Sequence, residues 1–193
     1  MNFQEVTALA VDITGRPDKV VQIRAAVNAT ISRLIMKNNF VNDVIDTTVN
    51  IDSTVYTGEV SLTQFTRFKS VKYVRPNTIK KCLDPVSMEK VFSNNAVRKD
   101  VFYVAGTNLV WVVGIVAQTL EIGYYTYAPR LDNTSNTHWL LDIVPDAIAE
   151  LAASKIFKSV GDDNSAAAYA TSGFTAFQEA TAHLLDRVAP VSA

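Results

Sequence analysis

The chain has 193 residues, of which 48% are hydrophobic and 19% are charged, and its formal net charge is −1. This length and apolar content predict a folded globular chain with a substantial core. The near-zero net charge excludes a global attraction to nucleic acid or membrane, and the low charged fraction predicts that other copies or partners cover part of the surface.

The sequence contains one cysteine, Cys82. An intrachain disulfide and a cysteine zinc site are therefore excluded, which fits a reducing compartment. Residues 1–15 lack a basic region followed by a long apolar stretch, so we expect no signal peptide. The most apolar window, residues 108–125, contains Glu121 and two glycines. It predicts two strands and not a membrane span.

The first part of the chain predicts helices. We expect a short helix over residues 3–10, followed by the stretch TGRPD at 14–18. From Asp18 to about Phe40 apolar residues recur at steps of three and four, which predicts a second helix. Pro17 suits a first helical turn, and an acid there complements the helix dipole. A phosphate loop would need several glycines, so we interpret TGRPD as a helix start and not as a catalytic turn.

The middle of the chain predicts β-structure. Threonine, valine and aromatic residues alternate over 46–56 and 65–74, which predicts two strands. Residues 101–113 predict a hairpin with its turn at 106–108, and residues 118–127 predict a further strand. Together they predict an antiparallel sheet of four to six strands. Neither face of 65–74 is purely apolar, which predicts an exposed or partner-facing strand.

The last third predicts two helices after a polar loop at 130–137. Pro145 marks the start of the first regular helix and Gly161 its end. An aspartate at 162–163 caps the second helix, which we expect to reach about Val188. Because the linker is short, the two helices should form an antiparallel hairpin.

This order of elements predicts an α+β fold. We expect a helical bundle, made of the N-terminal helix and the C-terminal antiparallel hairpin, with an inserted antiparallel β domain. The expected organisation is one domain over 1–193, with N-terminal helices over 1–43, the β region over 44–128, and the hairpin with its tail over 129–193.

No pattern typical of a catalytic or metal site is apparent. The two histidines, His138 and His183, have no partner at ligand spacing, and both are explained by positions near helix ends. Cys82 has no nearby base, and we expect it to be a half-buried structural residue although two lysines precede it. The acids at 162–163 lack the spacing of a calcium loop. We therefore expect no enzyme, no metal and no cofactor.

The charges are unevenly distributed. Residues 64–100 carry nine basic side chains against three acidic ones, whereas residues 128–187 carry four basic and eight acidic ones. The basic residues are Arg67, Lys69, Lys72, Arg75, Lys80, Lys81, Lys90, Arg98 and Lys99. This pattern fits three alternatives: attraction between identical copies, a surface for nucleic acid, or an ordinary solvated sheet edge protected by lysines.

Three segments together resemble the head-to-tail adaptor (connector) proteins of short-tailed bacteriophages. They are TGRPDKVVQIRAAVNATI at 14–31, FTRFKSVKYVRP at 65–76, and the stretch from YYTYAPRLDNTSNTHW at 124–139 through the helical hairpin to SAAAY at 165–169. They correspond in order to the N-terminal helix, the aromatic and basic strand, and the closing pattern of that family.

The resemblance implies a structural virion protein without catalytic residues. Such adaptors form a ring, typically of about twelve copies, that joins the portal protein to the tail tube or nozzle protein at the head-tail interface. Genomic DNA passes through the channel without sequence-specific binding, and no membrane is involved. The ring would assemble in the host cytoplasm, and segments such as 93–100, 130–137 and 189–193 would become ordered on docking.

Two sets of residues are expected to contact partners. The interface set is Arg67, Lys69, Lys72, Arg75, Lys80, Lys81, Arg98 and Lys99. The docking loop set is Arg130, Asp132, Asn133 and Asn136.

Two other functions remain as alternatives. A nucleic-acid-binding module would use the basic and aromatic strand region 64–81, where Phe65, Phe68 and Tyr73 alternate with basic residues as on single-strand binding surfaces. An enzyme acting on a small molecule would need a convergent polar cluster, and the sequence offers no obvious one.

Overall fold

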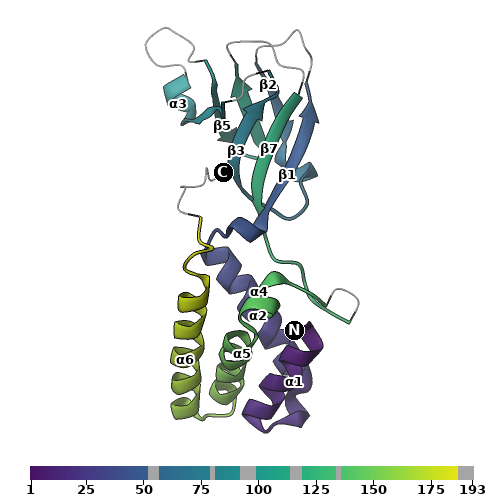
Figure 1. Ribbon diagram of the computed structural model, residues 1–193, viewed down its shortest axis with the longest axis vertical. Coiled ribbons are helices and arrows are strands. Elements are labelled where there is room, and N and C mark those ends of the chain that lie inside the picture. The colour runs from purple at the N-terminus through teal and green to yellow at the C-terminus, as the bar shows by residue number, and fades with distance from the viewer. Residues whose placement is uncertain (52–56, 79–80, 92–98, 114–118, 134–135, 187–193) are drawn as a thin grey trace. The chain divides into compact units, whose positions relative to one another are not determined.

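The computed structural model describes residues 1–51, 57–78, 81–91, 99–113, 119–133 and 136–186. The fold is α+β, as the sequence predicts. By its internal contacts the chain divides into two compact units (Figure 1). The helical unit comprises Met1–Asn38 and Ala128–Leu185, and the β unit comprises Asn39–Tyr127 and the chain from Asp186 onwards.

The helical unit begins with α1 (Phe3–Thr14) and α2 (Val20–Lys37). Asn2 caps α1 through a reciprocal capping box with Glu5, which satisfies backbone N–H groups that the first turn leaves unpaired. Gly15 ends α1 with a φ of 61°, a conformation that glycine adopts without strain. The TGRPD stretch therefore closes one helix and leads into the next through the 3₁₀ turn Pro17–Lys19.

The C-terminal helices of this unit are α4 (Trp139–Ile143), α5 (Pro145–Ser159) and α6 (Asp163–Thr181). Pro145 begins α5, and Asp162 caps α6, as predicted. The expected end of α6 near Val188 is wrong, because the helix ends at Thr181 and residues 182–184 form a turn.

Helix α5 is the centre of the helical unit, because α1, α2, α4 and α6 all pack against it. Its contact faces consist largely of small residues, including Ala149, Ala152 and Ala153, which are fully buried. Small side chains let helix backbones approach closely. Gly173 of α6 lies so near α5 that an added Cβ would be 2.9 Å from the carbonyl oxygen of Ala147.

The β unit contains two sheets, whereas we expected one. The three-stranded sheet has the order β1-β7-β3, with β1 (Val44–Asn50), β7 (Thr119–Thr126) and β3 (Phe68–Pro76). The four-stranded sheet has the order β2-β6-β5-β4, with β2 (Thr57–Ser61), β6 (Asn108–Val112), β5 (Val101–Ala105) and β4 (Asp84–Pro85). All strand pairs are antiparallel except β4 with β5, which is parallel.

The short helical elements of the β unit are the 3₁₀ turns Val41–Asp43 and Leu62–Gln64 and the helix α3 (Met88–Val91). The predicted hairpin is confirmed: β5 and β6 pair across a turn at Gly106, whose φ is 59°.

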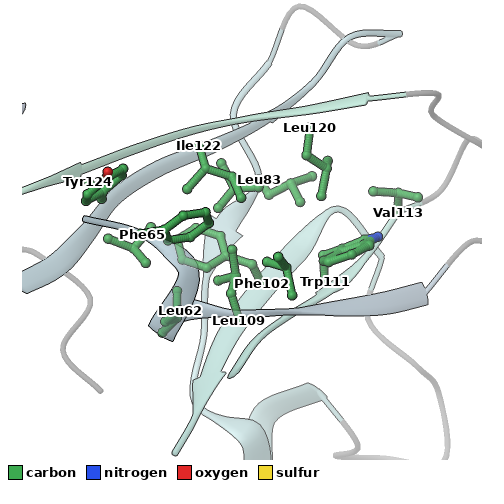
Figure 2. Packing of buried hydrophobic residues seen from close by; sticks show 13 residues of the cluster. Leu62, Phe65, Leu83, Phe102, Leu109, Trp111, Val113, Leu120, Ile122 and Tyr124 are labelled. Carbon is green, nitrogen blue, oxygen red and sulfur yellow. The ribbon is translucent and has the colours of Figure 1, made fainter. Parts of the chain in front are cut away.

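The two sheets share one apolar core (Figure 2). Leu120, Ile122 and Tyr124 of β7 contribute from one sheet, and Leu109 and Trp111 of β6 contribute from the other. This packing of two sheet faces removes large side chains from water, which is the main stabilising contribution to such a unit.

Strand β3 does not keep the simple alternation that its sequence predicts. Its pairing with β7 shifts register between Phe68 and Ser70 and again between Val71 and Tyr73. As a result the neighbours Ser70 and Val71 are both buried. Such irregularities are common at sheet edges, and β3 is an edge strand.

Candidate functional site

The basic residues of β3 are partly neutralised within the β unit. The Lys72 ammonium lies 2.6 Å from a carboxylate oxygen of Asp186, whose side chain is only 8% exposed. The same ammonium lies over the Tyr125 ring, 5.9 Å from its centre. Burial, and then the neighbouring Asp186, raise the pKa of the Tyr125 hydroxyl. Lys72 therefore holds the chain near Asp186 against the sheet and is not a free cation.

Arg75 is paired in the same way across the sheet. Its guanidinium donates two hydrogen bonds to Glu121 on β7. The Tyr73 hydroxyl oxygen lies 2.8 Å from Asp46 and 3.0 Å from Glu121, and its single proton is shared between these two acceptors. The Tyr73 ring covers Gly123, where a side chain would clash with it. These bonds link all three strands of the sheet β1-β7-β3.

The pKa values of this network follow from its contacts. Hydrogen bonding to Arg75, and then to Tyr73, lowers the pKa of Glu121. Burial, and then the bonds to Asp46 and Glu121, raise the pKa of Tyr73. Glu121 is therefore held as a carboxylate and Tyr73 as a neutral phenol, an arrangement that stabilises the sheet.

The other residues of the interface set divide into three groups. Lys69 is half-buried, and burial lowers the pKa of its ammonium although Asp43 partly opposes the effect. Arg67, Lys81 and Lys99 are exposed. Lys80 and Arg98 lie outside the described residues.

Two of the three aromatic residues of region 64–81 pack in or against the core: Phe65 belongs to it (Figure 2), and Phe68 is partly buried against it. Phe65 is 8% exposed and stacks on Tyr124, with ring centres 5.1 Å apart. Phe68 lies 5.8 Å from the same ring. A single-strand binding surface needs exposed aromatic faces on which bases can stack, and these two rings do not provide them.

The docking loop is attached to the helical unit at three points. The side-chain amide of Asn28 on α2 accepts a bond from the Leu131 N–H at 2.8 Å and donates one to the Leu131 carbonyl at 3.0 Å. Gln4 donates to Asn133 at 3.4 Å, and the carbonyl of Asn136 accepts a bond from the backbone N–H of Phe3 at 2.7 Å. Residues 134–135 lie outside the described range.

This attachment leaves the outer side of the loop accessible. Arg130, Asp132 and Asn133 are exposed, whereas Leu131 is buried. Beside the loop an open groove of about 620 Å³ is lined by residues of α1, α2 and the loop, including Arg24 and Arg130. Asn28 was not predicted as a site residue, because its only local signal is an amide within a helix, where asparagine is unfavourable.

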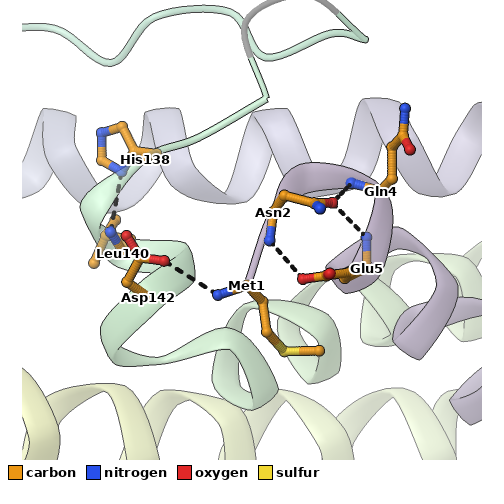
Figure 3. A network of polar contacts seen from close by, with 7 residues as sticks. All are labelled: Met1, Asn2, Gln4, Glu5, His138, Leu140 and Asp142. Carbon is orange, nitrogen blue, oxygen red and sulfur yellow. Dashed lines mark hydrogen bonds and ion pairs between the residues drawn. The ribbon is translucent and has the colours of Figure 1, made fainter.

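A second group of polar contacts joins the N-terminus to α4 (Figure 3). The terminal amino group of Met1 lies 3.1 Å from Asp142. Nδ1 of His138 accepts a hydrogen bond from the backbone N–H of Leu140, which caps α4. His138 therefore has a structural explanation, as predicted.

The remaining candidates for chemistry are also explained by structure. Arg16 donates two hydrogen bonds to Asp18, and this contact lowers the pKa of the Asp18 carboxyl to about 2. Cys82 is exposed, so the expectation of a half-buried cysteine is wrong. Among the described residues no group of His, Cys, Asp and Glu is arranged to hold a metal ion. No helix within that part of the chain is long and apolar enough to cross a membrane.

Comparison with known proteins identifies the family. The family model of the SU10 adaptor protein matches residues 1–192. No curated protein matches the chain. The family match confirms the resemblance to phage head-to-tail adaptors and covers nearly the whole chain. The chain therefore belongs to the SU10 adaptor protein family, a phage head-tail adaptor family, and is a structural adaptor protein of the phage virion.

Proposed function

We propose that the protein forms a ring of identical copies that joins the portal to the tail tube or nozzle. The observation that carries this proposal is the family match over residues 1–192. The charged fraction of 19% supports it, because a chain of this size whose whole surface faces water normally carries more charge. The ring has about twelve copies, the number that the resemblance to phage head-to-tail adaptors implies.

In this role the protein positions its neighbours and catalyses no reaction. It surrounds the channel through which the genome passes and binds DNA without sequence preference, because a channel must let DNA slide. Assembly takes place in the host cytoplasm before the virion is released.

Two surfaces are candidates for the contacts with the portal and the tail. One is the outer side of the docking loop with its adjoining groove, where Arg24, Arg130 and Asp132 offer charges of both signs. The other is the set of exposed basic residues of the β unit, Arg67 and Lys81 among them. Lys72 and Arg75 are weaker candidates, because each already has a carboxylate partner.

Light scattering tests the proposal directly. The mass of the chain is measured alone and then after mixing with the portal ring encoded by the same genome. We expect the chain to join the portal with one copy per portal subunit. If the chain does not bind the portal, the proposal that it joins the portal to the tail is wrong.

A salt titration against single-stranded and duplex DNA separates this role from the alternative of a nucleic-acid-binding module. Tight, salt-sensitive binding by the chain alone would favour the alternative. We expect weak binding without sequence preference.

A further inference from the structure

A groove runs along α5 between α2 and α6 within the helical unit. Two adjoining hollows of about 280 and 380 Å³ form it, and both are lined by Ser154, Lys155 and Ala170. Part of the lining is apolar: Leu34 lies on the α2 side, and Phe174, which is 48% exposed, lies on the α6 side. An exposed aromatic ring beside an open groove suits the binding of another helix.

Four cationic side chains line this groove: Arg33, Lys37, Lys155 and Lys158. Lys158 lies 2.8 Å from Asp163 and is paired with it. The other three form no ion pair with any described residue. We call this site the cationic groove.

Lys155 is the most informative of these cations. It is half-buried, and its ammonium donates only to neutral oxygens, to Thr30 at 2.8 Å and to the Ala26 carbonyl at 3.4 Å. Burial, and then the positive charge of Arg33, lower its pKa. A cation that is partly removed from water beside a second cation is unfavourable unless a carboxylate neutralises it. Within the described residues of its own chain that carboxylate is missing.

A matching acidic surface lies on α1. Glu5, Ala8 and Asp12 are exposed and follow one another at steps of three and four, so they lie on one face of the helix. The helix carries no lysine or arginine. Ala8, between the two acids, allows another helix surface to approach closely. Helices α1 and α6 pack against α5 from different sides (Figure 1).

We propose that the cationic groove receives α1 of a second copy of this chain, with Glu5 and Asp12 facing the cations. The inference rests on the ring described under Proposed function and assigns its contact between neighbours. A ring needs two different complementary surfaces on each copy. Each copy has both within its helical unit, so it can offer α1 to one neighbour and accept α1 from the other.

A protein helix fits this groove better than nucleic acid. The helical unit carries eight basic and ten acidic side chains, a net charge of −2, which disfavours a polyanion. The apolar lining from Leu34, Leu151 and Phe174 also suits side chains of a helix better than phosphates.

Charge reversal tests the contact. Asp12→Lys and Lys37→Glu each place like charges opposite one another, so each should weaken ring assembly on the portal at least about tenfold. The double variant restores opposite charges and should recover most of the loss. Both positions are exposed, and a lysine in the last turn of α1 also suits the helix dipole, so both variants should fold.

Two controls make the same charge changes away from the contact. Glu179→Lys on α6 and Lys19→Glu before α2 lie outside the cationic groove and should assemble like the unmodified chain. Assembly is measured by sedimentation of mixtures with the portal ring, and folding by circular dichroism.

Photo-crosslinking identifies the occupant. A benzophenone amino acid replaces Phe174, and isotopically heavy and light copies are mixed before assembly. We expect crosslinks between heavy and light copies that join position 174 to the peptide containing α1. A ring that forms without this crosslink, or one that tolerates both single reversals, overturns the inference but leaves the adaptor role intact. Crosslinks to the portal or to DNA alone also overturn it, and the absence of any ring overturns both proposals.

Discussion

The ion pair between Lys72 on β3 and Asp186 allows a quantitative prediction about the stability of the β unit. The two charged groups are 2.6 Å apart, and their side chains are 25% and 8% exposed. The backbone N–H of Asp186 also donates to the Asn39 carbonyl, so the pair fixes the point where the chain returns to this unit. We consider Asp186→Asn and Lys72→Met, alone and together.

Each single substitution removes one charged group and leaves the other, Lys72 or Asp186, without its ion-pair partner. Removing one member of a fully buried pair costs 3–5 kcal/mol, and the partial exposure of Lys72 reduces this to about 2 kcal/mol for each change. Replacing both members removes the charges together, so the double variant should also lose about 2 kcal/mol instead of the sum of about 4. The expected coupling is therefore about 2 kcal/mol.

Urea unfolding measures these values. Trp111 is 4% exposed in the β-unit core and reports its unfolding by fluorescence, provided that Trp139 of the helical unit is replaced by phenylalanine in all variants. The comparison pair is Arg75 and Glu121, whose side chains are 46% and 34% exposed, so that its coupling should be smaller, below about 1 kcal/mol. Additive losses at Lys72 and Asp186 would refute the reasoning that the pair acts as one buried unit.

Three further predictions concern other contacts. Gly173→Ala should destabilise the helical unit by about 1–2 kcal/mol in thermal unfolding, because the clash of the added methyl group with the α5 backbone outweighs the gain in helix propensity. The control is Ser172→Ala at the exposed neighbouring position, which should be neutral or slightly stabilising. Asn28→Ala should increase amide hydrogen exchange at Leu131 without changing exchange in the β sheets, since both bonds that hold the loop are lost. Tyr73 has a raised pKa in the folded state, so the unfolded chain ionises first and the β unit should lose stability as the pH rises above about 10. Tyr73→Phe should reduce this loss of stability, and a variant that loses as much stability above this pH as the unmodified chain would contradict the prediction.

The starts of the helices were largely predictable because local chemistry sets them, whereas two ends were not: α1 reaches Thr14 and not residue 10, and α6 ends at Thr181. Pro145 starts α5, and Asp162 caps α6, as expected from residues with fixed φ or a side-chain acceptor. The sheets were less predictable, because their pairing is not local. Strand β1 pairs with β7 through residues that are 69 to 81 positions apart in sequence. The register shifts in β3 move Ser70 and Val71 to the interior together. Neither the division into two sheets nor these shifts has a signal in a single strand.

The charged residues also show that contacts between distant parts of the chain cannot be predicted from local sequence. A count over residues 64–100 includes Lys72 and Arg75 as free cations, but their partners, Asp186 and Glu121, come from outside that window. The cationic groove is the opposite case, since Arg33 and Lys155 are more than one hundred residues apart in sequence and become neighbours only when α2 packs on α5. An excess of charge along the sequence therefore says little about binding. A half-buried cation without a carboxylate is more informative, because its unfavourable burial is relieved when a partner supplies the missing charge.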